Sequence, residues 1–123
     1  MAVSVKLRYL RHSAKKLRPM ARIFVGKSLD TALQSTALMT QDSAKFLHKA
    51  LLMAQASAKD KELGDNLVVS AIMATEGPKI KRMRPNARGR SNAYQKHLAH
   101  LTVSLSVQEP KATKTKRQTK EKK

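Results

Sequence analysis

From Glu76 to Ser91 the sequence reads EGPKIKRMRPNARGRS, and these residues with their flanks indicate the architecture of the chain. A β-branched, apolar segment, residues 67–75, precedes it, and Leu and Val alternate with Thr and Ser in residues 101–107 beyond it. Both flanks have the pattern of strands, and we expect them to pair. The insert between them, residues 76–98, is too long for an ordinary hairpin loop. It therefore predicts a β-hairpin arm that projects from the body of the protein.

The arm carries seven cations and one acid, and Pro85, Asn86 and Gly89 place its tip near the middle. About ten extended residues on each side, at roughly 3.3 Å per residue, would carry the tip roughly 30 Å from the body. Such an arm has no core of its own, so its cations repel one another unless phosphates neutralise them. Arg, which forms bidentate contacts with phosphate, outnumbers Lys four to three here. An exposed basic loop without a partner is the weaker interpretation.

Upstream of the arm the sequence predicts one strand and three helices. Residues 3–9 alternate apolar and polar side chains, which places Tyr9 on the buried face of a strand. After Ser13, apolar residues at positions 17, 20, 21 and 24 have helical spacing, although Pro19 should kink this helix or delay its start. A second short helix is expected after Ser28. A third should run from about residue 42 to the turn at 64–66, with an apolar stripe that Phe46, Ala50 and Met53 widen.

Charge is the strongest global signal in this chain of 123 residues, a length that fits one domain. Lys and Arg number 26 and Asp and Glu 8, which gives a net charge of +18. The excess is concentrated: residues 1–27 carry eight cations and no acid, whereas residues 28–75 are nearly neutral. This distribution favours a nucleic acid as the partner. The basic tail, residues 107–123, is expected to be disordered when free and to serve either solubility or nucleic-acid contact.

The sequence lacks the residues that enzymes, metal sites and membrane segments need. Without cysteine it cannot form disulfides, iron–sulfur clusters or thiolate zinc sites, which fits a reducing compartment. Lys6 and Arg8 leave no apolar signal core at the N-terminus, and the longest apolar stretch, residues 67–74, is far too short to span a membrane, so we expect neither a secretory signal nor a membrane span. His97 and His100 have no thiol or convergent carboxylate beside them, and no phosphate-binding glycine loop is present. We therefore expect no metal, no cofactor and no enzymatic activity.

The residues expected to contact nucleic acid lie in two basic segments. They are Arg8, Arg11, Lys15, Lys16 and Arg18 near the N-terminus, and Lys79, Lys81, Arg82, Arg84, Arg88, Arg90, Lys96 and His97 in the arm. Aromatic residues are scarce, and Tyr9, Phe24 and Phe46 fit core or sheet patterns. We therefore expect recognition of backbone charge and shape rather than base stacking. Tyr94 is the one stacking candidate in the arm, and packing along the hairpin is its alternative role.

Several motifs occur together in this chain: Arg8-Tyr9-Leu10-Arg11, a break at Gly26-Lys27-Ser28, the turn Glu76-Gly77-Pro78, the tip Ala87-Arg88-Gly89-Arg90, and the run from His100 to Leu105. This combination resembles the universal large-subunit ribosomal protein twenty-two in its bacterial form, over about residues 5–106. Asn86, His97 and Pro19 depart from the pattern usual in that family.

The resemblance implies an α+β domain, residues 1–106, with about three helices packed on a small three-stranded antiparallel sheet, and a long hairpin that reaches through ribosomal RNA. It also implies that Arg88, Gly89 and Arg90 are among the hairpin residues that bind this RNA. In that family the hairpin helps line the polypeptide exit tunnel, and the domain joins parts of the RNA during subunit assembly. The implied partners are large-subunit ribosomal RNA, neighbouring large-subunit proteins and the nascent chain near the hairpin tip, with no membrane partner. The implied location is the cytoplasmic ribosome of a bacterium, or that of a plastid.

Two other classes of protein fit parts of the pattern. An architectural DNA-binding protein with basic β-arms also combines helices with a proline-tipped hairpin, but such proteins are dimers that need an apolar dimer face. The apolar stripes here suffice for one core only. An enzyme that modifies or cleaves RNA would need a carboxylate or histidine constellation that the sequence does not supply.

Overall fold

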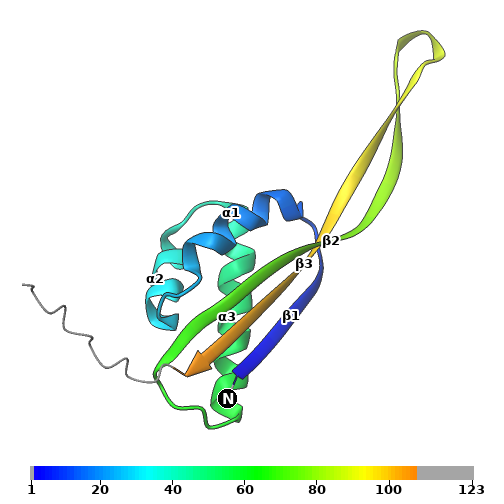
Figure 1. The fold of residues 1–123 in the computed structure, drawn as a ribbon. Coiled ribbons are helices and arrows are strands. Elements are labelled where there is room, and N and C mark those ends of the chain that lie inside the picture. Colours follow the sequence, from blue (N-terminus) through cyan, green and yellow to red (C-terminus); the bar gives the residue numbers. More distant parts are fainter. Residues whose placement is uncertain (1, 108–123) are drawn as a thin grey trace, which may run out of the picture.

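The computed structural model describes residues 2–107, which form a three-stranded antiparallel sheet with three helices packed against it (Figure 1). The elements are β1 (Ala2–Leu10), α1 (Ala14–Phe24), α2 (Leu29–Leu38), α3 (Asp42–Asp60), β2 (Leu67–Pro85) and β3 (Ser91–Val107). The strand order is β1-β3-β2, so β3 is central. The expected α+β class is confirmed. The expected basic tail lies outside the described residues apart from Val107, which is the last residue of β3.

The helices pack against one face of the sheet, and alternation along β3 shows which one. Ala99, Leu101, Val103 and Leu105 are buried, whereas the residues between them are partly exposed. Leu101, Val103 and Leu105 meet the buried stripe of α3 and the fully buried side chain of Phe24 at the end of α1, whereas Ala99 packs with residues near the start of α1. We call the helix-covered side the inner face of the sheet and the opposite side its outer face. The predicted stripe of α3 is confirmed except at Met53, which is 42% exposed and lies on the solvent side.

The helix ends follow local signals with two differences from expectation. Helix α1 begins at Ala14, directly after Ser13, so the later start that Pro19 suggested is wrong. Pro19 cannot donate to the carbonyl of Lys15, but both residues are exposed, so water can satisfy that carbonyl. Helix α2 is capped as expected, because the Ser28 hydroxyl accepts from the Thr31 backbone N–H at 3.4 Å. Helix α3 ends at Asp60, before the predicted turn at Gly64.

The arm is a continuation of two sheet strands. Pairing of β2 with β3 runs from Leu67 opposite Val107 to Pro85 opposite Ser91, and residues 86–90 form the tip. Figure 1 shows the hairpin extending well beyond the helices. The pairing shifts once inside the body, after Val69, and once at the base of the arm, between Glu76 and Lys79. The predicted hairpin arm is therefore confirmed.

The shift at the base of the arm depends on Gly77. A Cβ atom added there would lie 3.0 Å from the carbonyl oxygen and 3.3 Å from the Cβ atom of Leu98, which is tighter than ordinary contact. We expect Gly77→Val to lower the free energy of unfolding by about 1–3 kcal/mol, the usual cost of overpacking. Urea unfolding would measure this. Met73→Val, at a strand position that is 60% exposed, is the control and should change stability by less than about 0.5 kcal/mol. Equal effects of the two variants would contradict the prediction.

Candidate nucleic-acid interface

The register of β2 and β3 divides the arm into two faces, because successive side chains of a strand point to opposite sides. The outer face of the arm continues the outer face of the sheet and consists of Ile80, Arg82, Arg84, Asn92, Tyr94, Lys96 and Leu98. The inner face of the arm continues the helix-covered side and consists of Lys79, Lys81, Met83, Ala93, Gln95 and His97. Cations therefore lie on both faces. Apart from half-buried Ile80 and Leu98, all these side chains are exposed.

On the outer face, Tyr94 organises two arginines. Arg82 is its direct cross-strand partner, and the guanidinium carbon of Arg84 lies 5.6 Å from the centre of its ring. A ring that holds a guanidinium group in this way limits its rotation and leaves its outward edge free for phosphate. Tyr94 thus packs along the hairpin, which was the alternative role expected for it. It remains 39% exposed.

At the base of the arm, Arg11 joins residues that are distant in sequence. It lines a hollow of about 430 Å³ together with Ile80, Arg82, Lys96, His97 and Leu98. Four of the predicted residues therefore meet at one concave surface. Among residues 2–107 the only ion pair is Lys45 with Asp42, so the cations of this hollow have no acidic partner there. Such a surface attracts anions.

The tip of the arm is a tight turn that presents two arginines. The backbone N–H of Asn86 donates to the carbonyl of Arg90 at 2.6 Å. Arg88 and Gly89 have φ angles of 59° and 70°, in the left-handed region that favours glycine. Arg88 is not a glycine, so its conformation is strained, and strain of this kind is common at binding sites. A hollow of about 360 Å³ at the tip is lined by Asn86, Ala87, Arg88, Arg90 and Asn92.

The predicted cations of α1 lie apart from these hollows. Lys15 and Lys16 are exposed at the start of α1. Arg18 is held against β2, where its Nε donates to the carbonyl of Ala74 at 3.4 Å. These three residues therefore form a separate basic surface on the helix.

Tyr9, like Met53, is exposed where the sequence pattern predicts burial. The alternation in residues 3–9 predicted a buried ring, but Tyr9 is 62% exposed and has a φ angle of 55°. The pairing of β1 with β3 breaks between Leu7 and Leu10, and Leu10 takes the inward position opposite Ala99. An apolar residue directly after Tyr9, at a spacing of three from Leu7, was the available signal for this irregularity. The bulge turns the ring outward.

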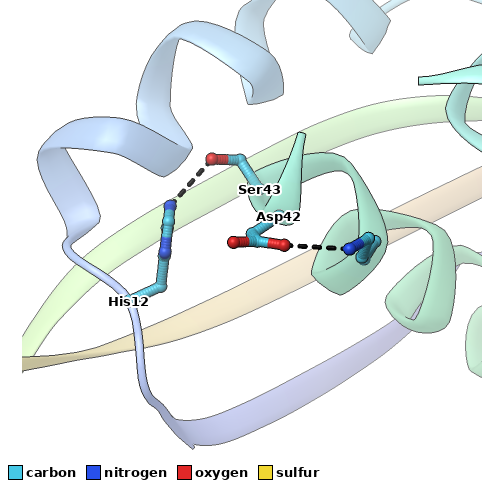
Figure 2. A network of polar contacts seen from close by, with 4 residues as sticks. His12, Asp42 and Ser43 are labelled. Atoms are coloured by element: carbon cyan, nitrogen blue, oxygen red, sulfur yellow. Dashed lines mark hydrogen bonds and ion pairs between the residues drawn. The ribbon is translucent and has the colours of Figure 1, made fainter. Parts of the chain in front are cut away.

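A cluster of His12, Ser43 and Asp42 has the residue types of a hydrolase site but not its connections. His12 Nε2 and Ser43 Oγ are 2.8 Å apart, whereas Asp42 accepts from Lys45 at 3.0 Å (Figure 2). The hydrogen bond and charge of Lys45 hold the pKa of the Asp42 carboxyl below its ordinary value. In a catalytic triad the carboxylate instead orients the histidine. The His12 contact ties the loop that carries Arg11 to the start of α3.

Two further expectations from the sequence, that the chain has no metal site and no membrane span, concern features that can be sought in residues 2–107. Within residues 2–107, no group of three or more His, Asp or Glu side chains is placed to hold a metal ion. None of the helices in that part of the chain is long and apolar enough to cross a membrane.

Comparison with known proteins gives the family. Residues 5–106 match the family described as Ribosomal protein L22p/L17e. A protein of Desulfosudis oleivorans named Large ribosomal subunit protein uL22 is 37% identical over 105 residues, which covers 85% of this chain and 92% of that protein. One of the same name from Akkermansia muciniphila is 39% identical over 111 residues, which covers 89% of this chain and 99% of that protein.

These matches confirm the resemblance drawn from the arm and its flanking motifs, and the bacterial type of ribosome expected from it. They also agree with the expectation that the protein is not an enzyme. The chain therefore belongs to the ribosomal protein L22p/L17e family, the uL22 proteins of the large ribosomal subunit, and is a structural, non-enzymatic protein.

Proposed function

We propose that this protein binds large-subunit ribosomal RNA through its arm and the basic surfaces of its body, and supports subunit assembly by joining RNA segments. The observation that carries the proposal is the arm itself. It has no core, nearly all of its side chains are exposed, and its cations have no acidic partner within residues 2–107. Phosphates can neutralise this charge, whereas in the free protein it opposes the compact hairpin.

The contacts are proposed at three places that the fold separates. The tip would place Arg88 and Arg90 deepest in the RNA. The hollow at the base would receive a phosphate between Arg11 and the arm. The basic surface of α1 would contact a further RNA segment, because Lys15 and Lys16 are exposed and neither residue lines either hollow. Three separate contacts of this kind are what a protein that joins RNA segments needs.

We further propose that the arm helps line the polypeptide exit tunnel, with its tip near the nascent chain, and that neighbouring large-subunit proteins contact the body. The length of the paired strands and the small tip of residues 86–90 support this proposal. A narrow two-stranded arm can pass between RNA helices where a globular domain cannot.

The proposal predicts that this chain cosediments with the large ribosomal subunit. A cell lysate would be fractionated on sucrose gradients in low and in high salt, and the chain followed by mass spectrometry. We expect it to stay with the large subunit through the high-salt wash, because many simultaneous phosphate contacts and a threaded arm dissociate slowly. Recovery with nucleoid DNA would instead favour the architectural DNA-binding alternative, and recovery in the top fractions would contradict any stable ribosomal contact.

A further inference from the structure

Tyr9, at the base of the arm, adopts a conformation that its residue type disfavours. Its φ angle of 55° lies in the left-handed region, which is rare for a bulky non-glycine residue. Such strain persists only where the surroundings hold it, and it concentrates at functional positions. Here the backbone N–H of Tyr9 donates to Nδ1 of His100 on β3 at 3.0 Å. The result is an aromatic ring that is 62% exposed at a place where the strand pattern would have buried it.

The same hydrogen bond defines the state of the His100 ring. A backbone N–H can only donate, so Nδ1 must accept, and the neutral imidazole then carries its proton on Nε2. The two rings meet edge to face, with centres 5.0 Å apart and planes at 85°. His100 therefore fixes the Tyr9 ring in orientation and offers an N–H donor beside it. An exposed ring whose orientation is already fixed loses little entropy when a flat ligand stacks on it.

The surroundings of this pair are cationic. Arg8 and Arg11 flank Tyr9 in the chain and are exposed, and Arg11 lines the basic hollow at the base of the arm with Lys96. His100 lies on the outer face of the sheet, in the same row of β3 as Tyr94 and Lys96 on the outer face of the arm. An aromatic platform beside cations that track a phosphate backbone is the arrangement by which proteins bind unpaired nucleotides.

We propose that Tyr9 and His100 form a binding site for one unpaired base of RNA, which stacks on the Tyr9 ring and accepts a hydrogen bond from His100 Nε2, with its phosphates near Arg8 and Arg11. This site rests on the proposed RNA-binding function and adds to it. A base inside a duplex is already stacked on both sides, so only a base released from a helix can use the ring. The site therefore selects RNA that contains a loop or bulge. Contacts to phosphate alone do not distinguish such RNA from a continuous duplex.

Substitutions at Tyr9 separate stacking from a role in the fold. Asn and Gly both tolerate the left-handed conformation, so Tyr9→Asn and Tyr9→Gly should keep or raise the melting temperature. Both should weaken binding to transcribed large-subunit ribosomal RNA about 5- to 100-fold, as loss of one stacked base does, while the dependence of affinity on salt stays as in the wild type. Tyr9→Phe, which keeps the ring, should recover most of the lost affinity. If Tyr9→Asn binds the RNA as the wild type does, the inference is wrong and the proposed function stands.

A spectroscopic test detects the stacked base directly. The chain has no tryptophan, so Tyr9→Trp places a single tryptophan, which can be excited selectively in the presence of Tyr94, on the proposed platform. We expect a short single-stranded RNA to quench its fluorescence strongly and a blunt RNA duplex of the same length to quench it little, at concentrations where both are bound. Leu38→Trp, at an 85% exposed position at the end of α2, is the control and should respond equally weakly to both. Equal quenching of Tyr9→Trp by the two RNAs would overturn the inference, and failure of the wild type to bind transcribed large-subunit ribosomal RNA would overturn the proposed function as well.

Discussion

Neutralising four arginines of the arm with glutamine is expected to weaken binding of large-subunit ribosomal RNA on the order of a thousandfold at about 0.1 M salt. The four are Arg82, Arg84, Arg88 and Arg90. Each phosphate contact releases counterions and contributes about 0.7 to 0.9 to the slope of log affinity against log salt concentration. Loss of four contacts should therefore lower the slope by about 3. Filter binding across a salt series measures both quantities.

The chain supplies a control with the same change in net charge. Residues 28–75 contain four lysines, at positions 45, 49, 59 and 61, and all of them are exposed on or beside α3. Replacing these four with glutamine also lowers the net charge from +18 by four. We expect the slope to change by less than about 1, because this nearly neutral region is not proposed to contact RNA. If both quadruple variants lose affinity equally, total charge rather than the arm governs binding.

Phe24→Ala is expected to lower the free energy of unfolding by about 3–5 kcal/mol. The ring has no exposed surface and packs in the main core cluster, where α1 and α3 meet the sheet. Removal leaves a cavity that surrounding side chains fill only in part. Since small domains are stable by about 5–15 kcal/mol in total, the variant should lose a large share of its stability. Urea unfolding followed by circular dichroism would measure the loss.

The neighbouring residue provides the comparison. Ile23 is 47% exposed on the same helix, so Ile23→Ala should cost only about 1 kcal/mol or less. Phe24→Ala should also weaken RNA binding only to the extent that it unfolds the protein, because Phe24 has no exposed surface through which to contact RNA. A Phe24→Ala variant as stable as Ile23→Ala would show that the core does not depend on this ring.

Most elements of the fold could be predicted because each has a local signal. The alternation in residues 101–107 and the stripe of α3 reflect the geometry of one strand and one helix, which neighbouring residues determine. The arm was predictable for a related reason. A long basic insert between two strand patterns has too few apolar residues to form a core of its own, so extension of the strands is its simplest regular structure.

The candidate site was predictable only in part. Composition marked the cations of the arm, but their division between two faces depends on register, and register shifts at the bulge beside Gly77. Likewise, the spacing of apolar residues suggested a wider stripe on α3, yet Met53 is exposed because no sheet strand or helix covers that side. A local sequence pattern indicates on which face of its helix or strand a residue lies. It does not indicate which of these faces packs against another helix or strand.

The strands, the helices, the position of the arm and the separation of basic from neutral segments all follow from local sequence, since each depends on residues close together in the chain. The order β1-β3-β2, the meeting of Arg11 with the base of the arm and the outward turn of Tyr9 depend instead on contacts between distant segments. Tyr9 and His100 are separated by 91 positions, and the hydrogen bond between them forms only when β1 lies beside β3. Pairing between distant segments therefore overrode the local alternation that would have buried the ring.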